Sequence, residues 1–166
     1  MESSSFAKET PVRLLDEAIR LSLDNVLSGA GGPFGAVVAR GERIVGSGSN
    51  QVTATNDPTA HAEVVAIRAA CRAEGAFELR GCVLYSSCEP CPMCLAACYW
   101  ARLDAVFFAA TREDAADAGF DDAFLYRELA LPNEGRALRV RPMPECGDAA
   151  RSVFQTWRVS ENKREY

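Results

Sequence analysis

Apolar residues recur along the chain with more than one period, and the first regular pattern is helical. The residues that repeat at intervals of three or four are Val12, Leu15, Ile19, Leu23 and Val26. This spacing predicts an amphipathic α-helix that packs through these residues. Thr10 followed by Pro11 predicts the start of the helix, and Gly29 predicts its end. Residues 1–9 are then expected to form a disordered lead-in.

Short apolar runs separated by turn residues follow this helix and predict strands. Two of them, at 34–39 and 44–47, flank a glycine turn and predict a β-hairpin. Two more, at 82–86 and 105–110, are separated by a predicted helix near 91–101, which indicates a right-handed crossover between parallel strands. The run at 105–110 contains only apolar residues, so we expect it to be buried on both faces of the sheet.

The remaining chain continues the alternation of helices and strands. The further elements predicted are helices near 60–73, 114–118 and 123–129, a strand at 138–143 and a final helix from Gly147 onward. We expect Val153, Phe154 and Trp157 of the final helix to face inward. Together these elements predict one α/β domain over residues 10–166, with three α/β/α layers around a mixed sheet of roughly five strands.

The composition narrows the class of protein. No apolar run is long enough to span a membrane, and the first ten residues do not have the pattern of a signal peptide. The net charge of -5 argues against tight binding of nucleic acid, which usually requires a basic surface. Seven cysteines, an odd number, favour a reducing cytoplasm over a secreted disulfide framework. The cysteines expected to be buried thiols are Cys71, Cys82, Cys98 and Cys146.

Two polar segments bring together the residue types of a metal site. The only histidine, His61, stands two residues before Glu63, and the run from Ser87 contains Cys91 and Cys94. Imidazole and thiolate are ligands that zinc prefers, and three protein ligands with a fourth position open to water describe a catalytic zinc site. The spacing matches the H-x-E…P-C-x-x-C signature of zinc-dependent nucleobase deaminases.

The same residues indicate a hydrolytic reaction. Zinc lowers the pKa of a bound water toward about 7, and Glu63 lies close enough along the chain to exchange protons with that water without binding the metal. The water would attack a carbon that carries an amino group, and ammonia would leave. Two other interpretations stay open. One is a zinc-binding interaction module with Cys88 or Asp57 as a fourth ligand, and the other is a histidine and cysteines that bind no metal.

At these motifs the chain resembles the cytidine-deaminase superfamily, and more closely its bacterial-type guanine deaminases. The resemblance runs from about Leu14 to Tyr166 and implies a cytidine-deaminase-like fold. The segments also shared with tRNA adenosine deaminases are 31–37, 56–63 and 87–94. The segments that favour guanine are 99–102, 118–122 and 165–166.

The resemblance implies a metal site, a set of residues that bind the substrate base, and a dimer. It implies one zinc held by His61, Cys91 and Cys94, a proton shuttle at Glu63, and conversion of guanine and water to xanthine and ammonia. The residues that it places against the base are Asn50, Phe34, Trp100, Asp122 and Tyr166. Ala62 and Cys88 would support the metal and the developing oxyanion. We also expect a homodimer in which the segment 153–166 is exchanged and Tyr166 closes the partner's pocket.

Several of these roles have plainer alternatives. Asn50 could cap a turn, Phe34 and Trp100 could be core aromatics, and Asp122 could cap a helix together with Asp121. The C-terminal tail could be a frayed helix end. Guanosine, cytidine or adenosine in tRNA could replace guanine, because each requires only a different pocket around the same zinc. The acidic balance of charge argues against tRNA.

Overall fold

The computed structural model describes the backbone of residues 3–165 and the side chains of residues 10–165. The chain divides into two compact units, Met1–Asp122 and Ala123–Tyr166, which are described one at a time. Among the described residues, no helix combines the length and the apolar character that crossing a membrane requires.

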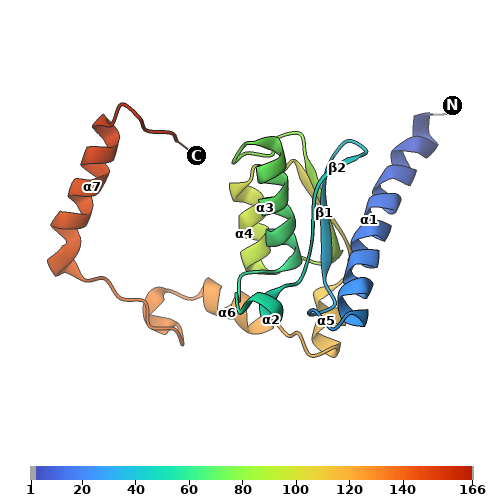
Figure 1. Ribbon diagram of the computed structural model, residues 1–166. Helices are drawn as coiled ribbons and strands as arrows, with labels where there is room; N and C mark the ends of the chain where they lie inside the picture. Colours follow the sequence, from blue (N-terminus) through green and yellow to red (C-terminus); the bar gives the residue numbers. More distant parts are fainter. Residues whose placement is uncertain (1–2, 166) are drawn as a thin grey trace. The chain divides into compact units, whose positions relative to one another are not determined.

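The first unit is built on a mixed β-sheet. Its strands are β1 (Gly35–Arg40), β2 (Arg43–Ser49), β3 (Val83–Cys88) and β4 (Ala105–Ala110). Their order in the sheet is β2-β1-β3-β4 (Figure 1). The strand β1 is antiparallel to β2 and β3, whereas β3 and β4 are parallel. The predicted hairpin and the predicted parallel crossover are therefore both confirmed.

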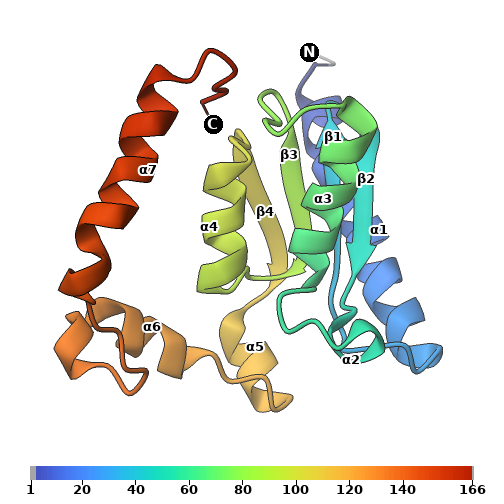
Figure 2. The ribbon, with the colours of Figure 1, turned by 60° about the vertical axis from the view of Figure 1, so that its left-hand side comes forward.

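Helices cover both faces of this sheet, as Figures 1 and 2 show. The helix α1 (Ser3–Leu27) lies on one face, and α3 (Ala62–Glu74) and α4 (Pro92–Trp100) lie on the other. Side chains of β1 alternate between the two cores, because successive residues of a strand point to opposite faces. Val37 packs with the α1 side and Val38 with the α3 side. The predicted α/β/α layering is present in this unit.

Glycines in β2 let α3 approach the sheet closely. A Cβ atom on Gly48 would lie 2.7 Å from the backbone O of Ala62 and 2.7 Å from the backbone N of Ala66. One on Gly46 would lie 2.5 Å from the backbone of Ala66 and of Ala70. Any side chain at these positions would push α3 away. The glycines thus determine how deeply the start of α3, next to His61, sits against the sheet.

The first helix differs from its prediction at its start and in its buried face. It begins at Ser3 and includes Pro11, and the hydroxyl of Thr10 donates to Glu42 Oε1 at 3.0 Å instead of capping the helix. The residues predicted to pack are largely exposed, and Leu14 and Ala18 are buried instead. The reason is a close approach at Gly35, where a Cβ atom would lie 2.2 Å from the carbonyl oxygen of Ala18. Such an approach requires a small residue, here Ala18, at the point where the helix meets Gly35.

The sheet also differs from its prediction in size. It has four strands in the described part of the chain, and residues 138–143 form none. Their apolar residues alternate with arginines as in a strand, but a strand also needs a neighbour to pair with, and this segment has none among the described residues. Being an edge strand, β4 is not buried on both faces, since Phe107 and Phe108 remain 45% and 44% exposed.

The second unit contains α6 (Ala123–Ala130), two short 3-10 helices at Asn133–Gly135 and Pro144–Cys146, and α7 (Gly147–Val159). The Arg136 guanidinium organises the turn after α6, where its Nε donates to the carbonyl oxygens of Glu128 and Leu131 at 3.1 and 3.0 Å. Cys146, predicted to be buried, is exposed at the start of α7.

The apolar side of α7 was also predicted to face inward, but it is largely exposed. Its residues are Val153, Phe154 and Trp157. The amphipathic pattern identified the helix correctly, but it does not specify which surface covers the apolar side.

Candidate functional site

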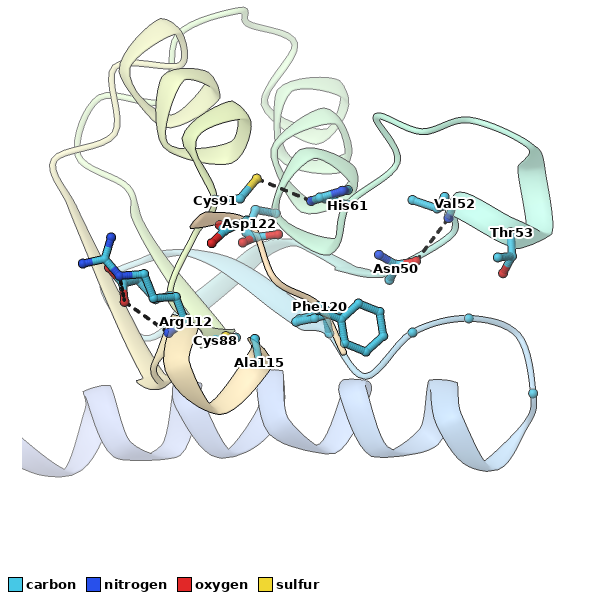
Figure 3. Close-up of a pocket in the computed structure, with 16 residues that line it drawn as sticks. Asn50, Val52, Thr53, His61, Cys88, Cys91, Arg112, Ala115, Phe120 and Asp122 are labelled. Carbon is cyan, nitrogen blue, oxygen red and sulfur yellow. Dashed lines mark hydrogen bonds and ion pairs between the residues drawn. The ribbon is translucent and has the colours of Figure 1, made fainter. Parts of the chain in front are cut away.

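The predicted metal ligands come together at the starts of two helices, and Figure 3 shows two of them, His61 and Cys91. His61 is the residue before α3, and Cys91 is the residue before α4, where Pro92 occupies the first helical position. Cys94 follows one turn into α4 and is buried. The Nδ1 atom of His61 lies 3.6 Å from the Sγ atom of Cys91 and 3.6 Å from that of Cys94. All three ligand atoms lie within 4.8 Å of one another.

These distances fit a tetrahedral zinc ion. Zinc–nitrogen bonds of about 2.0–2.1 Å and zinc–sulfur bonds of about 2.3 Å at a tetrahedral angle place the nitrogen and sulfur atoms about 3.5–3.6 Å apart. The two distances from His61 Nδ1 lie in this range. The ligand positions thus suit zinc without rearrangement of the helices that carry them.

The protonation state of Cys91 also suits a metal. Hydrogen bonds from Cys94 and then from His61 lower the pKa of Cys91 to about 4, although burial opposes this shift. The bond to Cys91 is the main reason why the pKa of Cys94 is raised. The bond to Cys91 likewise raises the pKa of His61. Cys91 is therefore a thiolate at neutral pH, which is the form of cysteine that binds metals.

The two residues considered as a fourth ligand are bonded elsewhere. The Cys88 thiol donates to the carbonyl oxygen of Thr111 at 3.4 Å, and burial raises its pKa to about 11. The Asp57 carboxylate accepts from the backbone N and the hydroxyl of Thr59 at 2.8 and 2.6 Å. In the described part of the chain, the ligand cluster contains three residues. This geometry favours a catalytic zinc site over a closed structural one.

Glu63 stands in the first turn of α3, next to the metal ligands, and is only 7% exposed. Burial raises the pKa of its carboxyl group, while its own backbone N–H and the Cys94 thiol lower it by donating hydrogen bonds to it. A carboxyl group with a raised pKa exchanges protons more readily near neutral pH than an ordinary glutamate. Glu63 is placed to move protons within the site.

A cavity of about 510 Å³ opens in front of these residues. The predicted residues that line it are Phe34, Asn50, His61, Glu63, Cys88, Cys91 and Asp122. Its volume is in the range of ordinary small-molecule sites, about 300–1,000 Å³. The sequence prediction thus identified much of the lining of one pocket.

Two of these residues offer opposite hydrogen-bonding character. Asn50 is buried, and its Oδ1 atom accepts from the backbone N of Val52 at 3.2 Å. Asp122 is half-buried, and burial followed by the charge of Cys91 raises the pKa of its carboxyl group. Asn50 is left with its amide N–H groups as donors, whereas Asp122 supplies an acceptor. A ligand with both donors and acceptors on its rim matches this pair.

Other residues line the cavity without having been predicted. Phe120 meets Phe34 edge to face at 5.0 Å between ring centroids, and the two rings form an apolar wall. The Nε atom of Arg112 lies 3.9 Å from Glu89, whose carboxylate also accepts from the Arg112 backbone N at 3.3 Å. Phe120 and Glu89 both belong to motifs recognised in the sequence. Because they are close in sequence to predicted site residues, they could have been predicted to line the cavity. No local signal marks Arg112.

Three predicted site residues that the structure describes do not line this cavity: Ala62, Cys94 and Trp100. Ala62 is buried at the start of α3, where its backbone O meets Gly48. Trp100 ends α4 and is 63% exposed. Tyr166 lies outside the described residues.

Similarity to known proteins agrees with this geometry. The family model of the cytidine and deoxycytidylate deaminase zinc-binding region matches residues 8–110, which include His61, Cys91 and Cys94. A tRNA-specific adenosine deaminase of Aquifex aeolicus is 42% identical over 126 residues, covering 76% of this chain and 82% of that protein.

The similarity to a guanine deaminase extends further along the chain. The chain is 52% identical to the guanine deaminase of Bacillus subtilis over 152 residues, which cover 92% of this chain and 96% of that protein. The X-ray structure of guanine deaminase from Bacillus subtilis aligns with a TM-score of 0.85 at 51% identity, covering 93% of this chain and 97% of that one. On the family match and this full-length similarity, the chain belongs to the cytidine and deoxycytidylate deaminase family of zinc-binding proteins.

Proposed function

We propose that this protein catalyses the zinc-dependent hydrolysis of guanine to xanthine and ammonia. The observation that carries the proposal is Asp122, an acceptor in the same cavity as Asn50 and the zinc ligands. Guanine presents N–H donors at N1 and at its amino group, and a carboxylate accepts from both. The similarity to guanine deaminase of Bacillus subtilis over nearly the whole chain supports the same substrate.

The remaining pocket residues bind the ring. Asn50 Oδ1 accepts from the Val52 backbone N, which orients the side chain, and the Asn50 Nδ2 group donates to an acceptor of the purine. Phe34 and Phe120 provide an apolar surface for the flat ring. Together with Asp122 they orient the amino-bearing carbon toward His61 and Glu63. Holding the reacting groups in one geometry increases the rate of their reaction.

The chemistry needs a nucleophile and a carrier of protons. Zinc held by His61, Cys91 and Cys94 supplies, when bound, a water of lowered pKa that is nucleophilic at neutral pH. Glu63 accepts a proton as this water adds to the carbon that bears the amino group. It passes this proton to the ring nitrogen, then takes the proton of the added hydroxyl group and delivers it to the amino nitrogen. The carbon–nitrogen bond breaks, and ammonia leaves.

Ammonia release measured over a panel of substrates tests the proposal. The panel contains guanine, guanosine, cytidine, cytosine, adenine and tRNA, because all could react at the same zinc site. We expect guanine to give by far the highest kcat/KM. Higher activity on a nucleoside or on tRNA would contradict the proposal and indicate a deaminase with a different substrate.

We further propose that the protein acts as a homodimer that exchanges its C-terminal segment, 153–166. Support comes from the apolar side of α7, where Phe154 is 67% exposed in the single chain. A segment that cannot bury its apolar side alone can do so on an identical partner, and exchange of an identical element closes a symmetric dimer. In this proposal Tyr166 covers the partner's cavity, which would exclude water from the site.

A mixing experiment tests this exchange. Deleting Glu165 and Tyr166 should leave zinc in place but reduce activity sharply. In hybrid dimers with Glu63→Ala chains, one site combines an intact Glu63 with a complete tail from the partner. Activity should therefore return on mixing. Normal activity of the truncated protein, or no recovery in verified hybrid dimers, would refute the exchange.

We also propose that the protein works in the cytoplasm. All seven cysteines are unpaired, and two of them are zinc ligands in the proposed site. A reducing compartment keeps cysteines in this form, whereas an oxidising one favours disulfides.

A further inference from the structure

A buried amide on α1 connects this helix to the cavity. Asn25 is 6% exposed and lies on the same helix face as Leu14 and Ala18, which pack on the sheet. It is not among the residues that line the cavity. A buried polar side chain in such an apolar position must have its hydrogen bonds satisfied.

The Asn25 amide group joins two segments that both lead to the cavity. Its Nδ2 atom donates to the carbonyl oxygen of Gly32 at 2.8 Å and to that of Asn50 at 2.9 Å. Nδ2 carries two hydrogens, so both are used. Gly32 precedes β1 and Asn50 follows β2, so a single side chain ties α1 to both ends of the hairpin.

The turn at Gly31 is packed tightly between the Asn25 amide and the Asn50 carbonyl group. A Cβ atom on Gly31 would lie 2.3 Å from the Asn50 carbonyl oxygen and 2.9 Å from Asn25 Nδ2. Only glycine fits there, and the turn is packed directly against the Asn25 amide. A change in the direction of the Asn25 hydrogen bonds would therefore move the turn and the end of β2 together.

Asn50 is held along its backbone by these contacts. Its backbone N donates to the Phe34 carbonyl oxygen at 3.0 Å, and its own carbonyl oxygen accepts from Asn25. Its side-chain Oδ1 accepts from Val52, which leaves Nδ2 as the donor toward the cavity. The Gly32 carbonyl oxygen accepts from the Phe34 backbone N at 2.8 Å as well as from Asn25. Asn25 thus bonds Asn50 directly and reaches Phe34 through the Gly32 carbonyl oxygen that both residues donate to.

We propose that Asn25 is a positioning residue, which sets the donor direction of Asn50 and the place of Phe34 and thereby determines the affinity for the purine base. The inference rests on the proposed function, since the base is the ligand whose affinity is set. Asn25 does not touch the zinc ligands, so the chemical step should depend on it little. Its loss should raise KM and leave kcat nearly unchanged, as for an interaction that binds substrate and transition state equally.

Asn25→Asp is the main variant, because it keeps the size of the side chain but places an acceptor against two carbonyl oxygens. We expect KM for guanine to rise about tenfold to a hundredfold, the scale of a lost buried hydrogen bond, with kcat within about threefold and zinc content unchanged. Ser28→Ala is the matched control. The Ser28 hydroxyl donates to the Asn25 carbonyl oxygen at the same helix end, 3.1 Å away, without reaching the cavity. This control should not change KM.

A double-mutant cycle separates positioning from a general structural role. If Asn25 acts through Asn50, then Asn25→Asp should raise KM by less than about threefold in an Asn50→Ala background. An equal rise of KM in both backgrounds would overturn the assignment. If Asn25→Asp does not fold, the same cycle is measured with Asn25→Ser, which keeps one hydrogen-bond donor. If neither variant folds, Asn25 supports the fold rather than the pocket, and the proposal is wrong.

A readout without substrate keeps this test separate from that of the proposed function. In NMR spectra, the side-chain amide signals of Asn50 should shift in Asn25→Asp and stay in place in Ser28→Ala. Unchanged Asn50 signals would overturn the positioning role whatever the substrate is. If the wild-type protein releases no ammonia from guanine while the Asn50 signals do shift, the proposed function fails and the positioning role stands.

Discussion

Replacing Asp122 by asparagine tests the recognition of guanine most directly. The substitution preserves the shape of the side chain but exchanges one carboxylate oxygen for an NH₂ group. Asp122 lines the cavity and is half-buried, so water cannot fully replace a lost partner there. One N–H of bound guanine would face the new amide donor. An unpaired buried donor costs about 1–3 kcal/mol, which corresponds to a loss of about tenfold to a hundredfold in kcat/KM.

The same residue should give guanine turnover a characteristic pH dependence. Burial, and next the charge of Cys91, raise the pKa of Asp122 above its ordinary value of 3.8. Only the ionised carboxylate accepts from two donors. As the pH falls through this raised pKa, the carboxyl group gains a proton and kcat/KM decreases. This decrease of kcat/KM should begin at a higher pH than it would with an aspartate of ordinary pKa. The contribution of Asp122 to the decrease should be absent in Asp122→Asn.

Steady-state ammonia release, zinc analysis and thermal melting provide the measurements. Asp121→Asn is the matched control, because it makes the same chemical change one residue away and outside the cavity lining. Zinc content and Tm should not change in either variant. The reasoning fails if Asp122→Asn has normal guanine kinetics, or if both variants lose activity to the same extent. Asp122 would then belong to the start of α6 rather than to the substrate.

Three further predictions concern the metal, proton transfer and packing. Mass spectrometry of the native protein should find one zinc per chain, lost in His61→Ala and in Cys91→Ala, and full activity without zinc would contradict the site. Glu63→Gln should retain zinc while turnover falls by about a hundredfold or more, whereas loss of zinc would make Glu63 a ligand. Gly48→Ala should cost about 1–3 kcal/mol of unfolding free energy by overpacking and lower Tm in melting experiments. Gly135→Ala, whose Cβ atom would meet only ordinary contacts at 3.8 Å or more, should not.

Much of the metal site could be predicted because its residues are close in sequence. His61 and Glu63 flank one helix start, and Cys91 and Cys94 occupy another, so local geometry already brings each pair together. The hairpin and the parallel crossover were predictable for a similar reason, since short apolar runs and turns specify them. What joins the two helix starts is the sheet, in which β2 and β3 are both antiparallel to β1, so that the strand ends leading to α3 and α4 lie at the same edge.

The rest depended on contacts between residues distant in sequence. The buried face of α1 follows from its close approach to Gly35, which no periodicity of the helix itself reveals. Phe120 and Arg112 reach the cavity only because the chain after β4 returns to the starts of the two helices. Asn25 looks in the sequence like one polar residue on a helix, and the packed structure bonds its amide to Gly32 and Asn50, which line the cavity. The sequence alone predicted the ligand cluster and the proposed chemistry, because these depend on residue type and short spacing. Only the tertiary structure decided which faces are buried and which residues shape the pocket, because those depend on long-range packing.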